Sequence, residues 1–495
     1  MSTEALFSAL SACHPDSVVF HGSSFEWRAR DVAEEVASLA QRLAEVRVLA
    51  ILADNSPDWA MADLAALRTG TPVLPLPPFF TAAQLAHALE QTGADTVLTD
   101  QPERILGLGL GFEIGEQRRG LVWLGRGIKP VALPAGTAKI SFTSGSTGAP
   151  KGVCLSAEGL LDTARALKSR LADLPIERHL CVLPLSLLLE NSAGIYAPLL
   201  RGAEVHLPGL AELGWQGMSG FDPCLLQQQV AAVGANSVIL VPELLKAWTL
   251  LIEHSGMRAP ESLSFAAVGG ARVEPGLLAT ARDYGLPAYQ GYGLTECGSV
   301  VSLNVPGDDR DGVGRPLPHV AVSINDGEVV VRSRAFLGYL GDAGTRSAAD
   351  YATGDLGHFD ADGHLHLAGR KRNLLITSFG RNVSPEWVES LLLAQPEIAQ
   401  AVVVGDGRPA LAAVLVPFPG VGRKQLAAAV GRATAALPDY ARLAGWIEAE
   451  PFSPQSGTLT GNGRPVRAAI LERYGAVLAS LYERHPDKET TDVLP

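Results

Sequence analysis

The sequence predicts an α/β protein that is divided into more than one domain. With 495 residues, the chain is longer than one hydrophobic core usually organises. Across residues 28–100, helical periodicity alternates with short apolar segments, which is typical of a parallel sheet layered with helices. From residue 314 onward strand patterns dominate, and the Asp-Gly pair at 326–327 predicts a hairpin, which indicates a β-rich part after the layered one.

The alternation near the N-terminus can be followed element by element. Apolar residues at helical spacing predict a helix over 28–43, and the strand-like VRVLAILA follows at 46–53. Residues 55–57, Asn-Ser-Pro, supply turn and capping groups for the next helix. The pattern then continues with a helix to residue 70, a strand over 71–78, a helix over 81–93 and a strand over 94–100.

Bulk composition narrows the class of protein. A formal net charge of −12 without a long basic run argues against a nucleic-acid surface. The five cysteines lack CxxC spacing, which predicts neither a disulfide framework nor a zinc site and suggests a reducing compartment. We find neither a signal-peptide pattern nor ~18 uninterrupted apolar residues, so we expect a cytoplasmic protein without a membrane span.

The stretch Ser141–Val153, SFTSGSTGAPKGV, surrounds one lysine with hydroxyl residues and glycines. Apolar segments flank it, so we expect a strand, a mobile loop and a second strand. Glycine amides, hydroxyls and an ammonium group together suit a polyphosphate. The spacing differs from the P-loop of NTPases, and a flexible surface linker is the alternative. The candidate phosphate-binding residues are Thr143, Ser144, Gly145, Ser146, Thr147, Gly148 and Lys151.

A second polar segment, QGYGLTECG, spans Gln290–Gly298. Tyr292 offers a ring for stacking, Thr295 a hydroxyl and Glu296 a carboxylate. A carboxylate near bound phosphates is what Mg²⁺ needs, because this ion bridges substrate phosphates through a few protein oxygens. Taken alone, the segment fits a helix cap equally well.

In this order, the two segments resemble the two signatures of the adenylate-forming enzymes, the family of acyl-CoA synthetases, luciferases and peptide-synthetase adenylation domains. The resemblance covers nearly the whole chain. It implies that Lys151 grips the phosphates of ATP, that Tyr292 borders the adenine and that Glu296 binds Mg²⁺. Lys151, Thr295 and Glu296 are then catalytic candidates, and further nucleotide-binding candidates are Gly270, Ala271, Gln290, Gly291, Tyr292 and Gly293.

Asp355 lies in a Thr-Gly-Asp turn, and aspartate is the usual partner of a ribose diol. The family resemblance assigns Asp355 and Arg370 to the ribose and phosphate of AMP. The Asp-Gly pair at 362–363 predicts a hairpin. His364 and His366 alternate on its second strand without carboxylates at metal spacing, so we expect both to be surface histidines.

Residues 183–190, LPLSLLLE, resemble the LPLSHxxE segment of long-chain acyl-CoA synthetases. Leu187 stands where those enzymes carry histidine, and plain buried core is the alternative explanation for this apolar run. Gly291 resembles the fatty-acyl members of the family, in which an acyl tunnel stays open. Both residues favour a medium or long aliphatic acid as the substrate.

The charged residues 369–373 lie where adenylate-forming enzymes divide. The resemblance implies a large domain over residues 1–371 that binds ATP and the acid, a small swinging domain over 372–484 and a disordered tail over 485–495. Arg372 occupies the family's pivot position. The expected fold is thus a large α/β domain of layered sheets with a β-rich subdomain, followed by a small mobile α+β domain.

Arg464 stands where the family has its adenylation lysine. Arginine keeps the positive charge, but its guanidinium is planar, bulkier and differently hydrated. Arg464 is therefore the catalytic candidate of the small domain, and Arg467 and Lys424 are the next candidates.

The resemblance implies an acid–thiol ligase with two half-reactions. A small-molecule carboxylic acid and ATP give acyl-AMP and pyrophosphate, and a thiol then takes the acyl group and releases AMP. We expect ATP, Mg²⁺ and CoA, or the phosphopantetheine of a separate acyl carrier protein in place of CoA. The alternatives are an adenylate user that makes another product, such as a β-lactone, and a catalytically weak acyl- or nucleotide-binding homologue.

Overall fold

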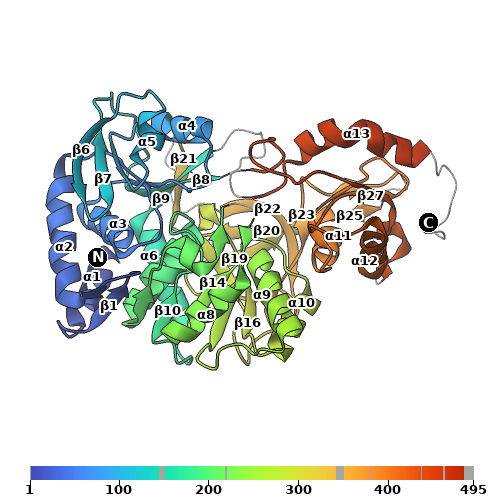
Figure 1. Ribbon diagram of the computed structural model, residues 1–495, viewed down its shortest axis with the longest axis horizontal. Coiled ribbons are helices and arrows are strands. Elements are labelled where there is room, and N and C mark those ends of the chain that lie inside the picture. Colours follow the sequence, from blue (N-terminus) through green and yellow to red (C-terminus); the bar gives the residue numbers. More distant parts are fainter. Residues whose placement is uncertain are drawn as a thin grey trace.

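The computed structural model shows a large part and, at the end of the molecule opposite helix α2 (Ala29–Arg42), a small part formed by the C-terminal residues (Figure 1). It describes residues 2–143, 151–217, 220–341, 350–378, 381–435, 437–460 and 463–483. This arrangement confirms the predicted fold class, a large α/β domain with a β-rich subdomain and a small α+β domain.

An eight-stranded sheet holds the first strand–helix alternation. Its central strands pair in parallel, with Leu49 opposite both Val73 and Thr96. Crossover helices join the parallel strands, as the alternating sequence predicts. In spatial order the strands are β21 (Phe336–Tyr339), β9 (Lys151–Ser156), β8 (Thr137–Thr143), β4 (Val73–Pro75), β3 (Leu49–Leu52), β5 (Thr96–Thr99), β7 (Leu121–Gly125) and β6 (Glu113–Arg118).

A nine-stranded sheet forms the second layer. Six of its strands, from β16 to β1 in the order below, pair in parallel, so their carboxyl ends reach the same edge. In spatial order the strands are β18 (Arg315–Pro316), β17 (Ser299–Leu303), β16 (Ala288–Leu294), β15 (Phe265–Val268), β14 (Ser237–Leu240), β10 (Arg178–Leu180), β11 (Glu204–His206), β1 (Val18–His21) and β2 (Glu26–Arg28).

Helices of the large part begin and end at capping residues that can be recognised in the sequence. The Ser56 hydroxyl accepts the Trp59 amide at 3.2 Å where α3 begins, and this helix ends at Gly70 with φ +74°. Thr81 and Gln84 form a capping box at the start of α4. The other helices of the large part are α1 (Ser2–Ala12), α3 (Pro57–Thr69), α4 (Ala82–Thr92), α5 (Pro102–Leu106), α6 (Ala157–Arg170), α7 (Ala197–Arg201), α8 (Pro223–Val233), α9 (Pro242–Ser255) and α10 (Pro275–Asp283). Within the described residues, none has the length and apolar character that crossing a bilayer requires.

The β-rich subdomain is a four-stranded antiparallel sheet, β19 (Ala321–Asn325), β20 (Glu328–Arg332), β22 (Asp350–Phe359) and β23 (Leu365–Arg370). The Asp-Gly pairs at 326–327 and 362–363 turn its two hairpins, as predicted. The expectation that His364 is a surface residue is wrong. Its side chain is 1% exposed, because the ring packs against the segment that carries Asp308, with Nε2 3.0 Å from Asp308 Oδ1.

The small part combines a three-stranded sheet with three helices. Two short strands, β24 (Leu375–Ile376) and β25 (Asn382–Val383), lead into it. The sheet and helices are β26 (Ile398–Val404), β27 (Leu411–Pro417), β28 (Leu443–Glu448), α11 (Pro385–Leu393), α12 (Arg423–Ala435) and α13 (Arg467–Glu483). The predicted tail over 485–495 lies outside the described residues.

A buried network that is centred on an ion pair joins the two large layers beside strand β8. Lys139 of β8 and Asp63 of α3 are 1% and 0% exposed, and Nζ lies 2.9 Å from Oδ1. Asn191 and Tyr196 complete the network from the π-helix η2 (Glu190–Tyr196): Asn191 Nδ2 donates to Asp63 Oδ2 at 3.0 Å, and Lys139 Nζ donates to the Tyr196 hydroxyl at 2.9 Å. Burial lowers the pKa of Lys139, and the Asp63 charge opposes that shift.

We expect Lys139→Met to destabilise the large part strongly. The methionine keeps the volume but leaves the Asp63 carboxylate buried without a cation, which costs about 3–5 kcal/mol of unfolding free energy. Chemical denaturation followed by tryptophan fluorescence measures the loss.

The double variant Lys139→Met/Asp63→Asn removes both charges and should recover most of that stability. A single variant as stable as the wild type, or a double variant less stable than the single one, would contradict this role of the ion pair.

Candidate active site

The predicted nucleotide-binding residues lie at the edge where the parallel strands end, which is where open α/β sheets bind ligands. β15 continues into residues 269–271, and β16 carries residues 290–293. The two segments are close neighbours, because a Cβ added to Gly269 would lie 3.9 Å from the Gly291 carbonyl oxygen. Gln290 is buried, Thr295 is half-buried, and Gly270 and Ala271 are exposed at this edge.

Close packing against β17 explains the two glycines around Tyr292. A Cβ on Gly293 would lie 1.6 Å from the Ser299 carbonyl oxygen, so no larger residue fits there. A Cβ on Gly291 would lie 3.0 Å from both Leu303 Cδ1 and the Ser302 carbonyl oxygen. Strand packing therefore accounts for Gly291 without an open acyl tunnel.

Asp355, Arg370 and Tyr292, predicted from separate motifs, form one cluster. Asp355 is 5% exposed, its Oδ1 lies 2.8 Å from Arg370 Nε, and the Tyr292 hydroxyl donates to Oδ2 at 2.6 Å. Burial raises the pKa of this carboxyl, and Arg370 and Tyr292 oppose the shift. A carboxylate offers about four acceptor positions, so the cluster retains acceptor capacity that fits ribose hydroxyls.

Glu296 follows β16 in the short helix η4 (Thr295–Cys297), and two tyrosines from other strands surround it. The Tyr339 hydroxyl donates to Glu296 Oε1 at 3.0 Å and lies 2.9 Å from the Tyr351 hydroxyl. Burial, followed by the Glu296 charge, raises the pKa of Tyr351, so this group remains a neutral hydroxyl. The carboxylate oxygens of Glu296 are hard ligands of the kind that Mg²⁺ takes, so this donor set fits the ion.

Tyr339 also joins Glu296 to the predicted phosphate-binding lysine. Lys151 Nζ lies 5.5 Å from the centroid of the Tyr339 ring, so one side chain contacts both charged groups. Sequence analysis missed Tyr339, because it stands in an ordinary strand pattern. Only the pairing of β21 with β9, with Tyr339 opposite Val153, brings it to the site.

The strands that flank the predicted phosphate loop are present. Thr143 ends β8 and Lys151 begins β9, and the two residues face each other in antiparallel register. Ser144, Gly145, Ser146, Thr147 and Gly148 lie outside the described residues. A cavity of about 210 Å³ adjoins the flanking strands and is lined by His87, Gln91, Phe142, Lys151, Gly152, Tyr339 and Leu340.

Arg464 reaches the same edge from the small part. Its Nη2 donates to the Gly270 carbonyl oxygen at 3.1 Å. Desolvation and the nearby charge of Arg370 lower the pKa of the guanidinium, whereas the carboxylates of Asp355 and Glu296 raise it. The group therefore stays a cation and lies within electrostatic range of both carboxylates.

The alternative cations of the small part have other surroundings. Arg467 Nη2 lies 2.6 Å from Glu389 Oε2, and Nη1 donates to the Val403 carbonyl oxygen at 3.0 Å, both within the small part. Lys424 is exposed on α12. The geometry thus favours Arg464 over Arg467 as the cation that meets the large part.

Lys246 of α9 fastens the small part from the large one. Its Nζ donates to the carbonyl oxygens of Leu393, Gln395 and Ile398 at 2.6, 2.5 and 2.8 Å. Leu393 ends α11 and Gln395 follows its C-cap, where helical partners are missing and a positive charge is favourable, whereas Ile398 begins β26. Burial lowers the pKa of Lys246 to about 8.

The chain changes its anchor from the large part to the small part within three residues. Lys371 Nζ lies 2.9 Å from Glu328 Oε2 in β20. Two residues later, Asn373 Nδ2 donates to Glu386 Oε1 in α11 at 2.5 Å. Arg372, the predicted pivot, stands between these two anchors.

Leu187 and Leu189 lie partly buried against the core of β10, β14, α8 and α9. A Cβ on Gly269 would lie 3.6 Å from Leu189 Cδ2, so this apolar segment adjoins the nucleotide edge. Glu190 is 0% exposed, and its two oxygens contact His179 Nε2 at 3.2 Å and the Leu183 amide at 2.9 Å. The segment is therefore both buried core and a wall beside the candidate site.

Sequence profiles of known families match both parts of the chain. The profile of AMP-binding enzymes matches residues 7–340, and that of the AMP-binding enzyme C-terminal domain matches residues 372–486. Among curated proteins, the long-chain-fatty-acid–CoA ligase FadD15 of Mycobacterium bovis is 27% identical over 432 residues, which cover 73% of this chain and 71% of that protein.

Two solved structures illustrate the structural similarity. The amide bond synthetase McbA of Marinactinospora thermotolerans has a TM-score of 0.76 at 25% identity, covering 96% of this chain and all of that one (100%). O-succinylbenzoate CoA synthetase of Bacillus subtilis, solved with ATP and a magnesium ion, has a TM-score of 0.73 at 22% identity, covering 94% of this chain and 98% of that one.

We expect Lys246→Met to loosen the contact between the two parts. The methionine fills a similar volume but removes the ammonium donor that the three carbonyl oxygens share. Double electron–electron resonance between one spin label on α8 and one on α12 measures the distance between the two parts. Its distribution should broaden toward longer distances in the variant.

Lys168→Met is the matched control, because Lys168 Nζ donates to the Leu200 carbonyl oxygen entirely within the large part. Its distance distribution should equal that of the wild type. An unchanged distribution for Lys246→Met as well would show that Lys246 does not fasten the small part.

Proposed function

The chain belongs to the AMP-binding enzyme family, and on that premise we propose that it activates a carboxylic acid with ATP and transfers the acyl group to CoA. Its curated relatives are AMP-forming acid–thiol ligases. The observation that carries the proposal is the approach of Arg464 to the Gly270 carbonyl oxygen, at the sheet edge whose strand β16 carries Tyr292, the partner of Asp355, and leads to Glu296. In this proposal these residues supply the nucleotide, metal and adenylation contacts.

In the first half-reaction, one oxygen of the acid attacks the α-phosphate of ATP, and pyrophosphate leaves. Magnesium, when bound, neutralises phosphate charge. Glu296 would hold the ion, with Tyr339 and Tyr351 fixing the carboxylate. Asp355 and Arg370 hold the ribose side of the nucleotide, and Lys151 and Arg464 supply positive charge where negative charge develops. The remaining loop residues, Thr143 through Gly148, complete the phosphate contacts in this proposal.

In the second half-reaction, a thiol attacks the acyl-AMP and AMP leaves. We assign residues 1–371 to the catalytic large domain and 372–484 to a domain that turns about Arg372 between the two steps. The change of anchor from Glu328 to Glu386 across Arg372 supports this pivot. The present pose, with Arg464 at Gly270, suits adenylation.

CoA is the favoured acceptor, because the curated relatives are CoA ligases. The amide bond synthetase among the structural neighbours makes a different bond, as its name states. A nitrogen acceptor and a carrier-protein thiol are therefore the acceptors against which CoA has to be compared.

We propose an acid with an apolar, medium or long aliphatic body as the substrate. The apolar segment at Leu187 and Leu189 beside Gly269 supports this choice, as does the fatty-acid relative. Relatives named for O-succinylbenzoate favour an aromatic acid instead, so both classes belong in the test.

The proposal predicts acid-dependent ATP–pyrophosphate exchange with Mg²⁺. A panel of aliphatic acids from short to long and of aromatic acids should show exchange that is strongest for an aliphatic acid. Adding CoA should then yield acyl-CoA and AMP in equal amounts. The absence of exchange with every acid, in a folded sample that binds AMP, would favour the binding-protein alternative.

Arg464→Ala should separate the two half-reactions. Acyl-AMP formation should fall by about 10²–10³-fold, as on removal of one preorganised electrostatic group, because the guanidinium serves the adenylation pose. Thioester formation from supplied acyl-AMP should change little. Stopped assays of each step, with Arg464→Lys as the charge-conserving control that keeps activity, provide the measurement. Equal losses in both steps would remove Arg464 from the adenylation role.

A further inference from the structure

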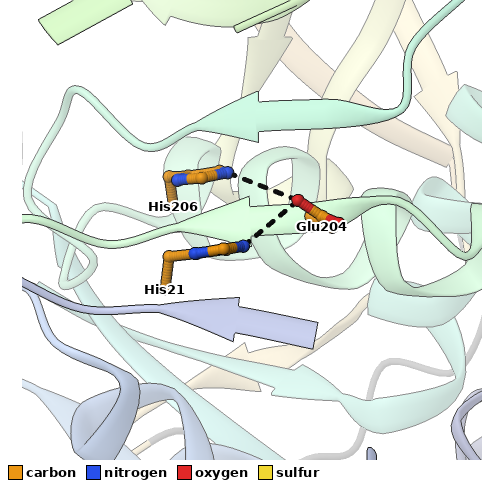
Figure 2. Close-up of side chains that lie close together, drawn as sticks. All are labelled: His21, Glu204 and His206. Carbon is orange, nitrogen blue, oxygen red and sulfur yellow. Dashed lines mark hydrogen bonds and ion pairs between the residues drawn. The ribbon is translucent and has the colours of Figure 1, made fainter. Parts of the chain in front are cut away.

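A second cluster of polar side chains lies on β1 and β11 of the nine-stranded sheet. In the strand order these strands are near the end opposite β15 and β16, which carry the candidate active site. β1 and β11 pair in parallel with His21 opposite His206, and Glu204 lies two residues before His206 on the same face of β11. The two imidazole rings stack with centroids 3.9 Å apart and planes 6° apart. Figure 2 shows both rings directing a nitrogen to the same carboxylate oxygen of Glu204.

We propose that His21, Glu204 and His206 form a binding site for a transition-metal dication of the zinc type. His21 Nε2 lies 3.1 Å and His206 Nε2 lies 3.7 Å from Glu204 Oε2, and the three ligand atoms all lie within 4.8 Å of one another. Ligand atoms ~2.0–2.2 Å from a tetrahedral zinc ion stand roughly 3.3–3.6 Å apart, which is close to these separations. Because the two rings stack in parallel, they would turn about their Cβ–Cγ bonds to aim both Nε2 lone pairs at one ion.

The state of His206 argues for a ligand rather than an ordinary ion pair. The residue is 9% exposed, and its Nε2 is buried and makes no hydrogen bond within the described residues. A buried ring nitrogen without a partner is unfavourable. A metal ion between the three side chains would take up its lone pair.

The neighbouring strand supplies the support that metal-bound histidines usually have. Glu26 of β2 lies opposite His21 in register, and its Oε1 lies 3.7 Å from His21 Nδ1. A carboxylate at Nδ1 orients the ring and leaves Nε2 to face the ion. Two carboxylates around two imidazoles also give the cluster the negative charge that a divalent cation needs.

Accessibility and ligand chemistry narrow the choice of ion. The side chains of His21 and Glu204 are 20% and 40% exposed, so an ion can enter and water can complete its coordination. Two imidazole nitrogens with one carboxylate suit zinc and its neighbours, whereas magnesium prefers oxygen ligands. Another cluster among the described residues, His179, Cys181 and Glu190, is fully buried. Its carboxylate is already hydrogen-bonded within the protein, so this cluster offers no route by which an ion could enter.

The proposed ion would join the N-terminal strands to the sheet rather than take part in acyl transfer. β10 and β14 separate β11 from β15 and β16, which carry the candidate active site. The proposal therefore stands independently of the acid and of the acceptor thiol.

The test is calorimetric titration of the chelator-treated full chain with Zn²⁺ in excess Mg²⁺, which occupies the magnesium site. We expect one tight Zn²⁺ per chain in the wild type and in Glu296→Gln. Glu204→Gln and His21→Gln should each weaken it by about tenfold or more. Both changes lie at partly exposed positions, so the variants should fold.

His254→Gln, at an exposed histidine on α9, is the matched control and should bind Zn²⁺ as the wild type does. Cobalt(II) substitution supplies a spectroscopic readout, because a tetrahedral site absorbs strongly in the visible range. Zn²⁺ binding that is unchanged in both Glu204→Gln and His21→Gln, or the absence of stoichiometric binding by the wild type, would overturn the proposal.

Discussion

The buried ion pair between Lys139 and Asp63 is the constraint on which the large part depends. It crosses from β8 to α3 and, through Asn191 and Tyr196, to the π-helix of the other layer. Because both charges are buried, α3 has to pack against β8 in one position for the pair to form, and Asn191 and Tyr196 then join the other layer to this pair. β8 ends only four residues later at Thr143, and the ion pair thereby fixes the strand from which the predicted phosphate loop departs.

The charged groups of the candidate site come from both parts of the chain, with carboxylates in the large part and a guanidinium from the small part. Asp355 and Glu296 each accept a hydrogen bond from a tyrosine hydroxyl within the large part, and Asp355 also pairs with Arg370 there. The Arg464 side chain comes from the small part and donates to a backbone carbonyl oxygen, at Gly270. An interaction of this kind is reversible at low cost, whereas a direct ion pair with Asp355 would hold the small part more firmly.

Lys246 stabilises the same arrangement of the two parts at a second contact, distant from the reacting groups. It donates three hydrogen bonds to carbonyl oxygens of the small part, while Arg372 stands between anchors on the two sides. In the proposed rotation these carbonyl oxygens would accept hydrogen bonds from water instead, so the contact can be exchanged rather than lost. The proposed two-pose cycle for acyl transfer would require such contacts at the domain interface.

The sequence alone determined the layered α/β fold, the hairpins at 326–327 and 362–363, and the identity of most site candidates, because periodicity, turn residues and short motifs are local properties. It did not identify Tyr339, which reaches Glu296 only through the pairing of β21 with β9. It also misjudged His364, whose burial depends on a packed neighbour at Asp308. The ion pair of Lys139 with Asp63 and the hydrogen bond between His21 and Glu204 join residues far apart in the chain, and only tertiary packing decides which distant side chains meet.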